Sequence, residues 1–278
     1  MEPAIFSGHP PDKTGTEQTR KAVEIMKTLA RVFACLALTL IFTWSGLSSG
    51  IAMAQAPQFT AEFRLEDCRF KTTGANPYLI LRPGYRKVFE GTDGGETVRL
   101  VITVLRQTET VSLPGIGVVR ARVVEERETV GGELVEVSRN LFAICDKTND
   151  VFYFGEAVDI FNPDGTVTHE GSWRAGEPAG DGAAQPGVIM PGTFLLGSRY
   201  FQERAEGVAM DRAEHVAMGL EVTTPAGTFE KCVRVVETTP LEPGQTVKIY
   251  CPGVGLVTDN VVSLVEFGSR SARDNDDE

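Results

Sequence analysis

The stretch that decides the fold is VVRARVVEERETVGGELVEVSRNLFAIC, residues 118–145, in which two strand-like runs flank the dipeptide Gly131-Gly132. Both glycines can adopt positive φ, the backbone conformation that a two-residue hairpin turn needs. We therefore expect strands at 118–130 and 133–145 to pair with each other antiparallel. This hairpin is the clearest local signal in the chain.

Similar turn signals extend the pattern in both directions. The sequence from Gly91 to Gly95 separates strand candidates at 86–90 and 96–111, and Pro163-Asp164-Gly165 separates 150–162 from 166–173. Further strands are predicted at 58–70, 198–206, 208–218, 221–224, 228–239, 245–251 and 258–267, with a turn-rich entry at 76–84 and a hairpin turn at Ala226-Gly227. Only 208–218 is ambiguous, because its charged residues would also suit a short amphipathic helical turn.

About ten strands, mostly joined by short turns and without a sustained 3.6-residue pattern, predict an all-β fold made of a single antiparallel sheet. Residues 98–105 are apolar on both faces, which is typical of a central strand. Long strands of this kind favour a strongly curved sheet, either a half-barrel or a closed barrel, over a flat sandwich.

A stretch rich in Gly, Ala and Pro, residues 169–192, interrupts the strands. It holds six glycines and three prolines between Gly171 and Gly192, which exclude a long helix and a central strand. Bulky apolar residues bracket it, among them Trp173 and Met190. We therefore expect a packed loop that folds across one end of the sheet and could act as a lid.

The first 54 residues have the parts of a secretory signal. Met26, the expected true start, precedes the basic Lys27 and Arg31 and an apolar run at 32–44, and Ala52-Met53-Ala54 supplies a small-residue cleavage pattern. The apolar run is too short for an uncleaved membrane anchor. We expect cleavage after residue 54, a β domain at 55–268, an acidic disordered tail at 269–278, no membrane span after cleavage, and an exported protein, periplasmic or secreted.

Charge and cysteine content narrow the functional classes. The chain carries 27 Lys plus Arg against 38 Asp plus Glu, a formal net charge of −11. This acidity argues against nucleic acids and anionic lipid surfaces as partners, since both attract basic patches. No C-x-x-C motif occurs, so a zinc or redox site is not indicated.

Four cysteines follow the signal region, and an even number in an oxidising compartment predicts disulfides. A four-residue loop that pairs Thr239 with Gly244 would place Cys232 opposite Cys251, at a separation that a disulfide spans. The second pair, Cys68 with Cys145, follows by exclusion.

Several short motifs together carry a family resemblance. They are DVFYFGE at 150–156, GSW followed by AG at 171–176, PGVIMP at 186–191, GSRYFQE at 197–203 and YCPGVGLV at 250–257. The ordered set, from about Asn76 to Phe267, resembles a family of exported bacterial β-rich proteins of unassigned function. More distantly it is similar to half-barrel envelope carriers of lipoproteins or lipids. The resemblance implies a curved sheet with an apolar hollow and no catalytic residues.

The chain departs from that pattern at two places. Residues 177–185 are longer and richer in alanine than in the family, and the four cysteines look peculiar to this branch. The departures bear on loop conformation and ligand preference and leave the sheet untouched.

The sharpest chemical candidate is Glu156. In the simplest hairpin register, Glu156 meets Trp173 and Ile160 meets His169, so that Glu156, His169 and Trp173 share one face. A carboxyl group held against an indole in an apolar hollow has a raised pKa and can donate a proton. The alternative is a structural carboxyl group that binds the backbone of the packed loop or lies outside.

Other candidates concern ligand and metal binding. Trp173, Met190, Tyr200 and Gln202 are expected, with Glu156, near the opening of the hollow, although Met190 also suits an ordinary core. His169 and His215 are candidate metal ligands with nearby carboxylates, but His169 and Glu170 point to opposite faces of a strand. Satisfied or surface histidines are the alternative, and no cofactor is predicted.

Three functional hypotheses remain open. The leading one is an exported, non-enzymatic binding or carrier protein for an apolar or amphiphilic small molecule or lipid. The second is a hydrolase or metal-dependent enzyme that uses Glu156 with His169 or Asp211. The third is an envelope or surface assembly protein that acts through an edge of the sheet.

Overall fold

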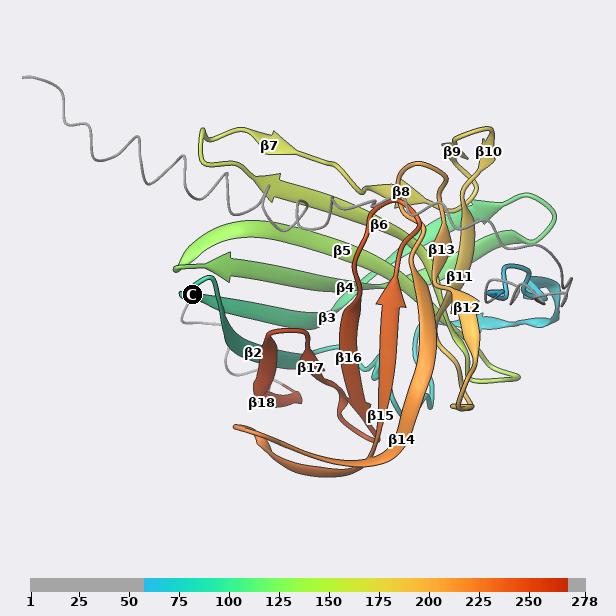
Figure 1. Ribbon diagram of the computed structural model, residues 1–278. Coiled ribbons are helices and arrows are strands. Elements are labelled where there is room, and N and C mark those ends of the chain that lie inside the picture. Colours follow the sequence, from blue (N-terminus) through green and yellow to red (C-terminus); the bar gives the residue numbers. More distant parts are fainter. Residues whose placement is uncertain (1–57, 270–278) are drawn as a thin grey trace, which may run out of the picture. The chain divides into compact units, whose positions relative to one another are not determined.

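A computed structural model describes residues 58–269 of the chain (Figure 1). The predicted signal region and nearly all of the predicted acidic tail lie outside the described residues. Within the described part, no helix is both long and apolar enough to cross a membrane.

Strands make up almost all of the regular structure, in agreement with the predicted all-β class. Besides the short 3₁₀ helix η1 (Leu65–Asp67), the elements are β1 (Phe70–Lys71), β2 (Tyr85–Asp93), β3 (Glu96–Leu113), β4 (Gly117–Val130), β5 (Glu133–Cys145), β6 (Val151–Phe161), β7 (Val167–Thr168), β8 (Trp173–Arg174), β9 (Pro178–Ala179), β10 (Gly182–Ala183), β11 (Gln185–Met190), β12 (Arg199–Phe201), β13 (Glu203–Arg204), β14 (Arg212–Thr224), β15 (Gly227–Thr238), β16 (Thr246–Cys251), β17 (Gly255–Asp259) and β18 (Val262–Ser269). The strands are more numerous than predicted, because short pairs form within the expected loops.

One antiparallel sheet runs in the order β12-β14-β15-β16-β17-β18-β2-β3-β4-β5-β6-β11-β13. In Figure 1 the long strands β3 to β5 cross behind β14 to β16. The two ends of this order, β12 and β13, are consecutive pieces of one segment: Tyr200 pairs with Ala213 of β14, and Glu203 pairs with Pro186 of β11. This segment brings the two ends of the sheet together, so the sheet is a nearly closed barrel.

The hairpin predicted at Gly131-Gly132 is confirmed. Val130 pairs with Glu133, and Gly131 and Gly132 have φ of 61° and 92°. The preceding hairpin is tighter than expected, since Asp93 pairs with Glu96 and the turn consists of Gly94-Gly95 alone. Local turn chemistry therefore fixes the register of this half of the barrel.

The hairpin after Pro163-Asp164-Gly165 differs in part from the expected register. Glu156 pairs with Trp173 as predicted, but Ile160 pairs with Thr168, so the prediction that it meets His169 is wrong. One additional residue is accommodated between the two short strands, where Gly171 has a φ of 85°. A turn of this kind changes the register without breaking the hairpin.

Two of the later strand boundaries also need correction. The expected strands at 208–218 and 221–224 are one strand, β14, with bulges that include the positive φ of 72° at Gly219. The expected strand at 258–267 is two strands, β17 and β18, separated by a tight turn at Asn260, whose φ is 48°. Asparagine tolerates this conformation better than most residues.

The Gly, Ala and Pro-rich stretch is only partly a loop. Its end, β11, is a strand between β6 and β13, contrary to the expectation that the stretch excludes such a strand. A Cβ atom added at Gly187 would lie 2.3 Å from the carbonyl oxygen of Phe201. Glycine is therefore required for close approach of two strands here, and its presence does not signal a loop.

The rest of this stretch packs against β3. The guanidinium of Arg174 lies 3.1 Å from the Glu109 carboxylate, and a Cβ atom at Gly176 would lie 2.5 Å from the carbonyl oxygen of Ser112. Within the stretch, Trp173, Ala175 and Ala184 are buried.

A second segment, residues 76–80, is here called the strap. The buried Asn76 side chain donates hydrogen bonds to the carbonyl oxygens of Asn149, Met190 and Pro191 at 2.9, 3.2 and 3.1 Å. Its own oxygen accepts hydrogen bonds from the backbone N–H groups of Tyr78 and Leu79. One asparagine thus fixes a segment that has no strand pairing of its own.

An apolar core lies on the outer face of β5 and β6. Phe63 and Phe70 make edge-to-face contacts with Phe152, and Phe70 also contacts Phe154. The disulfide between Cys68 and Cys145 fastens this covering segment to β5. The second disulfide joins Cys232 to Cys251, in the register that the sequence predicts.

Candidate functional site

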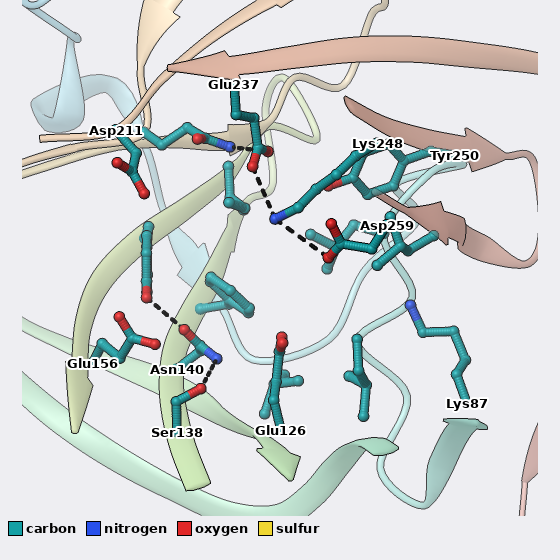
Figure 2. A pocket seen from close by; sticks show the side chains of 18 of the residues that line it. Lys87, Glu126, Ser138, Asn140, Glu156, Asp211, Glu237, Lys248, Tyr250 and Asp259 are labelled. Carbon is teal, nitrogen blue, oxygen red and sulfur yellow. Dashed lines mark hydrogen bonds and ion pairs between the residues drawn. The ribbon is translucent and has the colours of Figure 1, made fainter. Parts of the chain in front are cut away.

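The inside of the barrel contains a cavity of about 240 Å³ (Figure 2). Its walls come from β2 to β6, from β15 to β17, from the strap, and from the segment of β12 and β13 that closes the barrel, here called the closing segment. The lining comprises Tyr78, Leu79, Ile80, Lys87, Ile102, Val104, Val124, Glu126, Glu136, Ser138, Asn140, Phe142, Tyr153, Glu156, Ile189, Gln202, Glu203, Asp211, Glu237, Lys248, Tyr250, Leu256 and Asp259.

The cavity is acidic, which corrects the expectation of an apolar hollow. Seven of its side chains carry carboxyl groups, namely Glu126, Glu136, Glu156, Glu203, Asp211, Glu237 and Asp259, and two carry ammonium groups, Lys87 and Lys248. The inner face holds these groups because the opposite face packs on the apolar outer core: in β4, Val124 and Glu126 line the cavity, while Val123 points to the other side and is fully buried.

One side of the cavity holds a cluster in which one lysine is paired with two carboxylates. The Lys248 ammonium lies 2.8 Å from the Glu237 carboxylate and 3.7 Å from that of Asp259. Gln202 donates a hydrogen bond of 2.8 Å to the other oxygen of Glu237. Although burial opposes the charge of Lys248, Glu237 and Asp259 raise its pKa well above the ordinary value. This lysine is a fixed cation.

The other side of the cavity holds Glu156, opposite this cluster in Figure 2. Burial raises the pKa of Glu156, and hydrogen bonds from Tyr153 and Ser138 partly oppose the rise. The Tyr153 hydroxyl also lies within hydrogen-bonding distance of the Asn140 side-chain oxygen, and its one hydrogen can go to only one of the two acceptors at a time. The Asn140 amide donates to Ser138 at 3.4 Å. The Glu156 side chain is therefore held in a polar network that restricts its rotation.

Glu203 and Asp211 also line the cavity, and Glu203 interacts electrostatically with both Asp211 and Glu156. Glu203 is only 1% exposed; one carboxylate oxygen accepts a hydrogen bond of 2.6 Å from the backbone N–H of Asp211, and the other, Oε2, has no partner. Burial raises the pKa of Glu203 well above its ordinary value, and the neighbouring Asp211 carboxylate adds to the effect. Burial also raises the pKa of Asp211, followed by the charge of Glu237.

Glu126 and Lys87 also belong to the cavity wall. Burial raises the pKa of Glu126 to about 7, against the opposing effect of Lys248. Burial lowers the pKa of Lys87 to about 8, and its ammonium lies 5.5 Å from the centre of the Phe89 ring. Both groups therefore titrate near neutral pH.

The structure brings only some of the predicted ligand-binding residues to the cavity. Glu156 and Gln202 line it, whereas Trp173, Met190 and Tyr200 do not. Met190 is fully buried and faces away, because its neighbour Ile189 points inward from the same strand. Trp173 is buried and packs edge-to-face on the ring of Tyr153, at 5.1 Å between ring centres.

Neither histidine lines the cavity. His169 is at the surface, where Nδ1 lies 2.9 Å from the carbonyl oxygen of Val158 and 3.0 Å from Asp159. His215 is buried: Nε2 lies 2.9 Å from the Tyr200 hydroxyl and Nδ1 3.1 Å from the Leu195 carbonyl oxygen. In residues 58–269 no group of three or more His, Cys, Asp or Glu side chains is arranged to hold a metal ion.

The sequence contained one unused signal for the acidic wall. In β5, the polar residues Glu136, Ser138 and Asn140 recur at every second position and all line the cavity, while Val137 and Leu141 are buried on the other face. This alternation shows that one face of β5 is polar and the other is apolar. The prediction was wrong in placing the apolar face on the inside of the barrel.

Fold and cavity together define a nearly closed all-β barrel with an ionisable interior. No family model matches the chain, and no curated protein matches it. Among solved structures, a chain described as a "putative lipoprotein" from Parabacteroides distasonis ATCC 8503 is similar at 15% sequence identity, with a TM-score of 0.29 and coverage of 67% of this chain and 96% of that chain. A TM-score of this size does not establish a shared fold.

Proposed function

We propose that the protein is an exported binding protein that holds a small polar molecule inside its barrel. The observation that carries this proposal is the cavity of about 240 Å³, whose charged groups sit on rigid strands and are only partly neutralised by each other. Burying carboxyl groups without partners destabilises a fold, so such groups are common where a ligand binds. The two disulfides suit an oxidising compartment.

The proposal keeps the carrier hypothesis but changes its ligand from apolar to polar. The lining combines charged side chains with apolar ones, which come from the strap, at Leu79 and Ile80, and from the barrel wall. A ligand with a short apolar part and a polar or charged end matches this mixed lining.

A cavity-filling variant tests the proposal. Val104→Phe places a ring in the cavity, whereas Val118→Phe makes the same change at a residue that is 69% exposed. Native mass spectrometry of the exported full chain should show a bound small molecule in wild type and in Val118→Phe, and none in Val104→Phe. The proposal would be refuted if the wild-type protein showed only the mass of the polypeptide and all three proteins gave the same result. Circular dichroism controls for folding.

A second candidate is hydrolysis by a pair of carboxyl groups. Glu156 and Asp211, paired in the enzyme hypothesis, do line the same cavity and lie on the same side of it in Figure 2. His169 lies outside the lining and plays no part in it. A carboxyl group with a raised pKa can act as a general acid. Substrate screens should show turnover that Glu156→Gln abolishes; bound ligand that is never converted contradicts this candidate.

The sheet-edge hypothesis depends on the strand edges that barrel closure leaves unpaired. The two ends of the sheet, β12 and β13, are consecutive in the chain and each is paired on one side with a longer strand. Strand β12 covers only Arg212 to Glu214 of β14, so within residues 58–269 the rest of β14, as far as Thr224, has no strand partner on that side. An edge of this kind can pair with another chain.

A further inference from the structure

Five of the seven carboxyl groups of the cavity form no ion pair with a lysine or arginine within residues 58–269, namely those of Glu126, Glu136, Glu156, Glu203 and Asp211. The two cavity lysines are placed elsewhere: Lys248 lies between Glu237 and Asp259, and Lys87 lies beside the Phe89 ring. Of the five, Glu203 interacts electrostatically with both Asp211 and Glu156. The part of the cavity around Glu203 thus holds carboxyl groups that no cation of the barrel pairs.

The free oxygen of Glu203 is a second and independent sign of a ligand. Its carboxyl group is 99% removed from solvent, given the 1% exposure of the residue, yet Oε2 has no hydrogen-bond partner. A buried carboxylate oxygen without a donor costs free energy that a bound donor would recover. The backbone of Asp211 already occupies the other oxygen and fixes the direction of the group.

Aromatic rings complete the surroundings. Phe142 and Tyr153 line the same part of the cavity, with ring centres 4.9 Å apart. Carboxylates combined with aromatic faces are the chemistry that recognises an organic cation, since the rings attract positive charge and accommodate its carbon chain. A metal ion would need oxygen or nitrogen ligands converging on one point, and residues 58–269 offer no such group of three.

We infer that the Glu203 carboxylate binds the ammonium group of a small organic amine, with Glu156 and Asp211 adding negative charge around it. The inference rests on the proposed binding function and specifies its ligand class. An ammonium group has three N–H donors and no acceptor, which suits a site made of carboxylate oxygens. The Lys248 ammonium already occupies the side of Glu237 and Asp259, so the amine is oriented with its ammonium group toward Glu203.

Protonation supports the same assignment. The titratable groups that act on Glu203 are Asp211, Glu156 and Glu237, and burial raises its pKa well above the ordinary value. Without a ligand, Glu203 therefore favours its protonated form, and a bound ammonium ion would displace that proton. Binding of an amine should release protons, and its heat should depend on the ionisation enthalpy of the buffer.

Isothermal titration calorimetry at pH 7 tests the inference with two matched pairs of probes: 1,4-diaminobutane against 1,4-butanediol, and 2-phenylethylamine against 2-phenylethanol. At least one amine should bind the wild-type full chain at least about tenfold more tightly than its alcohol. Glu203→Gln should weaken that amine by about tenfold or more, and so should Glu156→Gln. Glu230→Gln, which removes an exposed carboxylate outside the cavity, should leave the affinity unchanged.

The outcomes separate the inference from the proposed function. If the alcohols bind as well as the amines, or if both cavity variants keep full amine affinity while folded by circular dichroism, the amine site is refuted and cavity binding stands. If no probe binds, the amine site is likewise refuted, and the mass spectra of the Val104→Phe experiment alone decide the proposed function.

Discussion

At the scale of single residues, His215 shows how partners decide what a side chain does. The sequence made it a candidate metal ligand, but both ring nitrogens are occupied, by Tyr200 and by the Leu195 carbonyl oxygen, and the ring stacks on Phe194 at 3.8 Å between centres. Nδ1 must donate to the carbonyl oxygen, so Nε2 accepts from Tyr200. Burial lowers the pKa of His215 to about 4, and the ring is neutral.

Removing the Tyr200 hydroxyl should therefore destabilise the fold. Tyr200→Phe leaves the buried Nε2 of His215 without a donor, and we expect a loss of about 1–3 kcal/mol in the free energy of unfolding, measured in urea at pH 7.5. Tyr78→Phe removes a hydroxyl that has no hydrogen bond to residues 58–269 and should change little. Equal losses in both variants would contradict the role of Tyr200 as a donor.

Glu126 gives a second prediction, on pH. Its pKa is raised from 4.5 to about 7, so the folded protein binds a proton more tightly than the unfolded chain does. The stability that Glu126 contributes is complete below pH 4.5 and is lost as the pH rises through 7. In urea titrations, Glu126→Gln should gain stability relative to wild type between pH 5 and pH 8. A difference that does not change with pH would show the shift to be absent.

At the scale of elements, local sequence predicted strands well where a turn encodes its own geometry. The Gly131-Gly132 hairpin and the Cys232–Cys251 register follow from turn residues alone. Strand β11 could not be predicted in this way. Its Gly187 is required because the carbonyl group of Phe201, 14 positions later in the chain, approaches it closely. No local sequence pattern predicts such a contact.

Strand β11 therefore supplies a test of close packing. Gly187→Ala introduces a Cβ atom 2.3 Å from the Phe201 carbonyl oxygen, so the pairing of β11 with the closing segment must shift, and we expect a loss of about 1–3 kcal/mol in unfolding free energy. Gly182→Ala is the control, since its Cβ atom would meet nothing within 4 Å. Thermal unfolding followed by circular dichroism should separate the two variants, and similar melting temperatures would contradict the packing argument.

At the scale of the whole molecule, the sequence predicted a curved antiparallel sheet but not which face points inward. Strands with apolar residues on both faces fit either arrangement. The choice depends on distant segments: Phe63 and Phe70 cover the outside of β6, and so the polar residues of β5 face the interior. Glu156 was found because its hairpin partner is local, whereas Glu203, Glu237 and Lys248 come together only when the barrel closes.

The two disulfides should contribute unequally to this closed fold. Cys68–Cys145 closes a separation of 77 residues and Cys232–Cys251 one of 19. In the chain-entropy model the longer loop stabilises by ~1 kcal/mol more. Replacing both cysteines of the first pair by alanine should therefore lower the free energy of unfolding in urea more than replacing the second pair. The reverse order would show that native contacts, not loop closure, dominate.

The strap can dock only after its partners have been made. Asn76 is synthesised early, but the carbonyl oxygens that hold it belong to Asn149, Met190 and Pro191, which are synthesised much later. Before residues 190 and 191 have been added, Asn76 lacks two of its three acceptors. Tyr78, Leu79 and Ile80 can therefore take their places in the cavity lining only late in synthesis, after the residues of β11 have been made.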